Sequence, residues 1–132
     1  MSNLVWTMME GQTGKVLRGQ LRDLNGAVDL DGFASPPKVQ VALSPASLLL
    51  VDLPVTPDAD QEAEVYEGGR SVSGKGWFEV VTEETFADLP QRSEGYLLSF
   101  KGMNGSEAVY FPLNRNHAQT YGRLIVQDPL GA

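Results

Sequence analysis

Hydrophobic and polar residues alternate with a period of two along most of the chain. In the run from 15 to 24, Leu17, Gly19 and Leu21 fall on one face of an extended chain, and basic and polar residues fall on the other. This alternation is typical of a half-buried β-strand. Comparable runs predict strands at 38–43, 48–55, 76–82, 96–101, 107–113 and 121–127, and residues 4–9 offer one more at the start.

The residues between these runs favour turns. Asn104-Gly105 is a strong hairpin signal, since both residues tolerate a positive φ. One segment, 83–89, has a helical pattern, because Thr82 is a capping residue, acids follow it and Pro90 ends the segment. We therefore expect an all-β protein of seven to eight strands with one short connector helix, arranged as an antiparallel β-sandwich or a small barrel.

The first nine residues are unusually apolar for a segment that precedes the first strong strand pattern. Within them, residues 4–9 have a single polar member, Thr7, and supply Leu4, Val5, Trp6, Met8 and Met9. They form either a buried edge strand or an N-terminal arm that packs on a neighbouring subunit, since Trp and Met are enriched in interface cores. Our expectation is that residues 10–132 form a single domain and that residues 1–9 are peripheral to it and bind a neighbour.

A second segment, 57–74, also stands apart from the strand pattern. Its first half is acidic, its second half is rich in Gly and Ser, and it is longer than most loops in compact domains. It is either a surface loop or an arm that orders against a partner. In the second case Val65 and Tyr66, its apolar pair, are the expected anchor.

Composition excludes several classes of function. The net charge of −7 argues against a nucleic-acid binder and against docking on an anionic membrane. No apolar run reaches the roughly 18–20 residues of a transmembrane helix, and the start has no signal-peptide pattern. Cysteine is absent and His117 is the single histidine, so disulfides, thiolate chemistry and Cys-containing zinc sites are excluded.

The remaining motifs carry little chemistry. Asp29-Leu30-Asp31-Gly32 lacks the later ligands of a calcium loop, so we interpret it as a turn. Glu83 and Glu84 suit the start of a helix, where the helix dipole stabilises acidic side chains. A glycosidase needs two carboxyl groups across a cleft with aromatic rings that stack on sugar, and two adjacent glutamates do not indicate such a site. Residues 11–15 lack the glycine spacing of a phosphate-binding loop and lead into a strand. We therefore expect no catalytic residue, no cofactor and no metal.

Residues 10–33 contain three short glycine-containing motifs. Gly11-Gln12-Thr13-Gly14 comes first, a D-x-x-G step follows at 23–26, and V-D-L-x-G spans 28–32. In this combination the segment resembles the start of the upper-baseplate-protein N-terminal domains of tailed bacteriophages. That family usually begins with G-D-T-G, so Gln12 stands where an Asp is usual.

The second half of the chain is similar to the same family. Residues 94–100 resemble its G-x-Y strand, and residues 110–112 together with the strand at 121–126 resemble its closing hairpin. The similarity covers about residues 10–127 and is poorest over the segment 57–74.

The resemblance implies an antiparallel immunoglobulin-like β-sandwich with a structural, non-enzymatic role in a virion assembled in the host cytoplasm. It implies a tail, baseplate or fibre-attachment adaptor that binds other virion proteins and forms a homo-oligomer in the particle. The alternative within a virus is a capsid decoration or cement protein that clamps shell subunits. An alternative of another class is a carbohydrate-binding module, with Trp77, Tyr66 or Tyr121 as the stacking platform.

Overall fold

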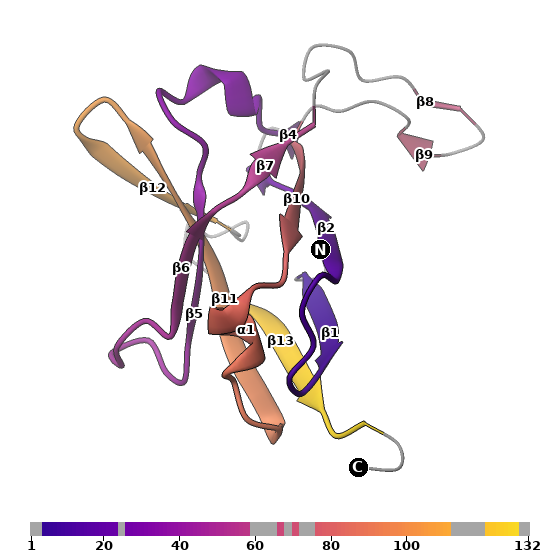
Figure 1. Cartoon of the computed structure of the whole chain (residues 1–132). Helices are drawn as coiled ribbons and strands as arrows, with labels where there is room; N and C mark the ends of the chain where they lie inside the picture. Colours follow the sequence, from indigo (N-terminus) through magenta and orange to yellow (C-terminus); the bar gives the residue numbers. More distant parts are fainter. Residues whose placement is uncertain are drawn as a thin grey trace.

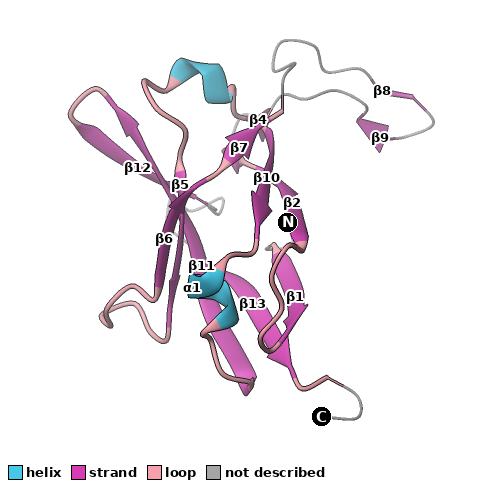
Figure 2. Cartoon of the chain, in the orientation of Figure 1, coloured by secondary structure: helices cyan, strands magenta, loops and turns pink. Residues whose placement is uncertain are grey.

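The computed structural model describes residues 4–23, 26–58, 66–67, 70–71, 76–111 and 121–129. In this part of the chain the structure is built almost entirely from β-strands (Figure 1). Two short helical elements interrupt them, the 3-10 turn η1 (Leu30–Gly32) and the helix α1 (Glu84–Ala87) (Figure 2). The predicted all-β class is therefore confirmed.

The larger sheet has the strand order β1-β13-β11-β5-β6, and β12 also pairs with β11. Its strands are β1 (Val5–Met9), β5 (Lys38–Ala42), β6 (Val51–Pro54), β11 (Arg92–Asn104), β12 (Glu107–Phe111) and β13 (Gly122–Gln127). The long strand β11 organises this sheet. It pairs with β5 along one edge, and with β13 and then β12 along the other.

A smaller sheet has the order β2-β10-β7 and shares its core with the larger one. Its strands are β2 (Val16–Gln20), β7 (Thr56–Pro57) and β10 (Trp77–Val81). Two further ladders contain two-residue strands only: β3 (Arg22–Asp23) pairs with β4 (Gly26–Ala27), and β8 (Tyr66–Glu67) with β9 (Arg70–Ser71). Eight of the described strands have four residues or more, and they lie on the runs that the alternation marked.

The pairing of the first strand selects the edge strand from the two alternatives for residues 1–9, and it corrects a second expectation. The strand β1 is the edge strand of the larger sheet, next to β13, so residues 5–9 are part of the domain (Figure 1). The pair is parallel, with Trp6 opposite Leu124 and Met8 opposite Val126, whereas we expected a purely antiparallel sandwich. A parallel pair needs a long connection, and here most of the chain supplies it.

Three aromatic rings join the two sheets. Trp6 from β1 contacts Phe78 from β10 and Phe100 from β11, with ring centroids 5.9 and 5.7 Å apart. Phe78 and Phe100 contact each other directly, with their centroids 4.9 Å apart. All three pairs have the tilted, edge-on geometry that aromatic rings prefer. The indole Nε1 of Trp6 donates a hydrogen bond of 3.0 Å to the carbonyl of Arg18, which ties β1 to β2.

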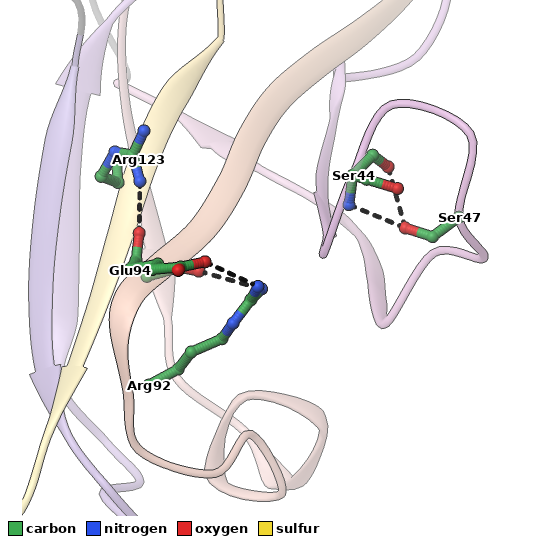
Figure 3. A network of polar contacts seen from close by, with 6 residues as sticks. Ser44, Ser47, Arg92, Glu94 and Arg123 are labelled. Carbon is green, nitrogen blue, oxygen red and sulfur yellow. Dashed lines mark hydrogen bonds and ion pairs between the residues drawn. The ribbon is translucent and has the colours of Figure 1, made fainter.

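A bulge redirects β11 near its start. Its register against β13 shifts between Arg92 and Tyr96, and Gly95 has φ of 71°. A side chain at Gly95 would also meet the carbonyl of Leu124 at 2.7 Å, so only glycine fits. Glu94 fastens this region: its carboxylate accepts a 3.1 Å hydrogen bond from Arg92, and its carbonyl accepts one from Arg123 (Figure 3).

Several element boundaries differ from the sequence prediction. The strand expected at 48–55 spans only Val51–Pro54, and the helix expected at 83–89 spans Glu84–Ala87. Thr82 does not cap that helix. It is buried, and its Oγ1 accepts a 3.0 Å hydrogen bond from the amide of Lys15. The hydroxyl therefore binds the segment just before β2 and not the first turn of the helix.

Tyr96 closes the corner between α1 and β11. Its ring is buried, and its hydroxyl donates a 2.5 Å hydrogen bond to the carbonyl of Pro90, six residues upstream. Burial raises the pKa of this hydroxyl above its ordinary value of 10.0. Smaller effects come from Arg92, which lowers the pKa, and Glu10, which raises it.

We predict that Trp6→Ala lowers the free energy of unfolding by about 3–5 kcal/mol, because it removes a buried ring and a hydrogen bond. That is a large part of the roughly 5–15 kcal/mol of a typical domain. Deletion of residues 1–9 should unfold the protein. Chemical denaturation followed by circular dichroism measures both effects. Val5→Ser, at a side chain that is 59% exposed on the same strand, is the control and should cost well under 1 kcal/mol. A stable truncated domain would contradict the assignment of β1 to the core.

We further predict that Tyr96→Phe costs about 1 kcal/mol of stability near neutral pH, because the carbonyl of Pro90 loses its donor. A raised folded pKa means that the folded state favours the neutral phenol. The contribution of Tyr96 is therefore complete below about pH 10 and declines as the pH rises toward the folded pKa. Denaturation midpoints of the two proteins should converge above pH 10. Tyr110→Phe, at an exposed ring, is the control, and an equal loss in that variant would contradict the role of the buried hydroxyl.

Candidate protein-interaction surface

The connection between β5 and β6 presents hydrophobic side chains to solvent. This segment, residues 43–50, is called the leucine loop here. Leu48 is 87% exposed, and Leu43, Leu49 and Leu50 are 40–47% exposed. The loop contains no charged residue. Soluble proteins rarely leave such contiguous apolar surface uncovered unless a partner binds it.

Internal hydrogen bonds give the leucine loop a defined shape. The amide of Ser44 donates to Oγ of Ser47 at 2.8 Å, and that hydroxyl donates back to the carbonyl of Ser44 at 2.8 Å (Figure 3). The amide of Ser47 also donates to this carbonyl at 3.1 Å, and the amide of Leu50 donates to Val41 at 2.7 Å. A loop already ordered loses less conformational entropy when it binds.

The leucine loop adjoins a shallow hollow on the larger sheet, on the face that points away from the core. We call this hollow the outer groove. It has a volume of about 130 Å³. Besides Ser44, Pro45, Ser47 and Leu49 of the loop, it is lined by Gln40, Ala42, Leu97, Ser99, Tyr110 and Tyr121. Ser99 is nearly buried there, and its hydroxyl donates a 3.2 Å hydrogen bond to the carbonyl of Phe111.

Two lysines lie farther along the same face. Lys38 of β5 pairs in register with Lys101 of β11, and both alternate with buried core residues. Asp52 lies 3.9 Å from Lys38, and the Lys101 ammonium lies 6.0 Å from the centre of the Tyr110 ring. The face thus carries uncharged side chains beside the leucine loop, and two lysines with one aspartate at its other end.

The chemical groups of this surface are of several kinds. Its lining consists of apolar, amide, hydroxyl and ammonium groups and the carboxylate of Asp52. Among the residues that the structure describes, no three His, Asp or Glu side chains come together as metal ligands would. Asp29 uses its carboxylate locally, accepting a 3.0 Å hydrogen bond from the amide of Asp31 at the start of η1.

The interface residues predicted at the N-terminus divide into two groups. Trp6 and Met8 are 5% and 1% exposed and pack in the core, so the expectation that they are peripheral is wrong, because β1 is a paired strand. Leu4 is partly buried against the same core. Val5 and Met9 point outward, and their interface role stays a prediction.

The second predicted anchor lies mostly outside the described residues. Val65 is not among the described residues, and neither is the single histidine, His117. The backbone of Tyr66 belongs to β8, and its side chain is not described. The role predicted for the segment 57–74 therefore also stays a prediction.

The outer edge of β1 is partly closed to strand addition. The Lys15 ammonium donates a 2.7 Å hydrogen bond to the carbonyl of Thr7, and the side chain of Gln12 accepts one of 3.0 Å from the amide of Met9. These contacts occupy backbone groups that a further strand would need. Lysine commonly prevents edge-to-edge pairing of sheets. The leucine loop is accordingly the better candidate for partner binding.

Sequence reasoning missed the leucine loop because it assigned Leu48, Leu49 and Leu50 to a strand that spans residues 48–55. Three consecutive leucines do not alternate, however, and in a strand they cannot all face the core. The turn residues Ser44 and Pro45 just before them were the second available signal.

Comparisons with family models, curated proteins and solved structures find no match to this chain. No helix among the described residues is long and apolar enough to cross a membrane. The interpretation of the surface therefore depends on its geometry and on the motifs in the sequence.

We predict that Ser47→Ala loosens the leucine loop without unfolding the domain. Removing the hydroxyl breaks two hydrogen bonds of an exposed turn, which should cost about 1 kcal/mol. The amide of Ser44 should exchange with deuterium several-fold faster, and amides of β11 should keep their protection. Ser35→Ala, in another loop of the same face, is the control. Unchanged exchange at Ser44 would show that the hydroxyl does not order the loop.

Proposed function

We propose that this chain is a non-enzymatic structural protein of a tailed-phage virion, with its place at the tail, the baseplate or a fibre attachment. The observation that carries the binding role is the ordered, uncharged leucine loop. The resemblance of residues 10–33, 94–100, 110–112 and 121–126 to phage upper-baseplate domains supports the placement in a virion.

The leucine loop suits a partner that offers an apolar pocket. Transferring one leucine side chain from water to an apolar site contributes about 1.5–3 kcal/mol. Leu48, with 87% of its surface exposed, has the most to gain and is the expected centre of the contact. Because Ser44 and Ser47 already order the loop, less of this free energy is lost to ordering.

The fold that we propose is immunoglobulin-like. Two sheets share one core, and Tyr96 makes the kind of hydrogen bond found in the tyrosine corner of such domains, where a tyrosine near the start of a late strand bonds to the backbone a few residues upstream. The short helix α1 precedes this corner. These features support the proposed fold, although β1 and β13 pair in parallel.

A capsid decoration protein would use the same surface, and only the position in the particle separates it from a tail adaptor. The carbohydrate-binding alternative has less support. The guanidinium of Arg18 lies 4.6 Å from the centre of the half-buried Trp77 ring, and Asp58 and Glu79 hold Arg18 there. A sugar would have to displace this cation before it could stack on Trp77.

We predict that Leu48→Thr combined with Leu49→Thr prevents incorporation into particles and preserves the fold. In an infection that supplies only the variant chain, purified particles should contain at least tenfold less of it than of the natural chain, as quantified by mass spectrometry. The circular dichroism spectrum should not change, because both side chains are exposed.

The matched control is Val16→Thr combined with Val81→Thr. These valines are 51% and 48% exposed and pair across β2 and β10. This variant should enter particles normally. Absence of the natural chain from all particles would overturn the virion assignment, and normal incorporation of the leucine variant would overturn the role of the loop.

A further inference from the structure

The basic end of the outer face contrasts with the charge of the whole protein. The chain has a net charge of −7, with ten Lys and Arg against seventeen Asp and Glu. Three lysines lie in the described residues, and two of them, Lys38 and Lys101, stand side by side on this face. A second hollow of about 160 Å³ lies against them, lined also by Ser35, Pro36, Asp52 and Met103. Electrostatic complementarity therefore points to an acidic occupant.

The outer groove and the lysine pair form one continuous strip, which we call the outer strip. Lys38 and Ala42, which lines the groove, are four residues apart on the strand β5, or about 13 Å. An occupant in extended conformation therefore needs a carboxylate and an apolar or aromatic side chain about four residues apart.

The chain itself contains a segment with this chemistry. Between positions 58 and 67 the sequence reads D-A-D-Q-E-A-E-V-Y-E, with five carboxylates, one apolar pair and no cation. Glu62 precedes Tyr66 by four residues, which matches the spacing of the lysine pair and the groove. We call residues 58–67 the acidic arm.

The attachment of the acidic arm favours binding to another copy. The amide of Asp58 donates a 3.0 Å hydrogen bond to the carbonyl of Trp77, and the carbonyl of Gly76 accepts one of 2.8 Å from Leu21. The chain therefore leaves and returns at the smaller sheet. That sheet packs on the inner side of the larger sheet, whereas the outer strip lies on the opposite side.

We infer that the acidic arm of one copy binds the outer strip of a second copy, with Glu62 at Lys38 and Lys101 and with Tyr66, on the same face of the extended arm, in the outer groove. This contact rests on the proposed assembly role and gives it a homotypic interface. Arm and strip are different surfaces, so the contact is heterologous and generates a ring or an open chain of subunits. Exposed ion pairs make the association weaken as salt increases.

Two full-length variants with reversed charges test this inference. The strip variant combines Lys38→Glu with Lys101→Glu, and the arm variant combines Asp60→Lys, Glu62→Lys and Glu64→Lys. Each one brings like charges together in its own homotypic contact. Sedimentation equilibrium at low salt should show self-association of the natural chain and at least tenfold weaker self-association of each variant. The equimolar mixture should associate again, because each arm then meets a strip of opposite charge.

Single substitutions supply the control for net charge. Lys101→Glu should weaken self-association, while Arg22→Glu, which changes the net charge equally on the distant strand β3, should not. Circular dichroism checks that every variant is folded.

Each other result overturns the inference. A natural chain that stays monomeric up to about 1 mM shows that no useful homotypic contact exists, including the case in which the arm binds its own strip. Variants that self-associate as the natural chain does place the interface elsewhere. A monomeric chain that still enters particles through the leucine loop overturns this inference alone, and absence from particles overturns the proposed function instead.

Discussion

The contact of Trp6 with Phe78 and Phe100 is the interaction on which the architecture depends. Each ring comes from a different part of the fold: the edge strand β1, the smaller sheet and the central strand β11. Their mutual packing sets the distance between the two sheets and holds the edge strand in place. The hydrogen bond from Trp6 to Arg18 adds a polar link at the same point, so the orientation of the indole is fixed as well.

The outer surface follows from this core. Because Tyr96, Leu98 and Phe100 point inward from β11, the residues between them must point outward and form the floor of the outer strip. The strands are thus used on both faces, one for stability and one for recognition. The leucine loop lies at the end of this face, because β5 and β6 are connected there. Its four leucines are exposed, so the connection contributes little to the core.

Local alternation was sufficient to predict the strands whose side chains pack on near neighbours. It placed Leu17 and Leu21 on one face of their run, which the structure buries, and it identified the all-β class. It failed where distant parts of the chain decide the outcome. The position of Trp6 stayed open between an edge strand and a peripheral arm, because its partner strand β13 is distant in the sequence. Thr82 was predicted to cap a helix, because its real partner, the amide of Lys15, is also distant. The outer strip was beyond prediction for the same reason, since Lys38 and Lys101 meet only through the pairing of β5 with β11.

The parallel pair of β1 and β13 has a consequence for biosynthesis. A ribosome delivers β1 long before β13, so this pair of the larger sheet cannot form until the chain has emerged as far as Gln127. Until then Met8 lacks its final neighbours and the inner edge of β1 lacks its hydrogen-bonding partner. Contacts between such distant residues slow folding, and the waiting apolar strand is exposed to other nascent chains. Chaperone binding during synthesis is therefore expected to concentrate on the first ten residues.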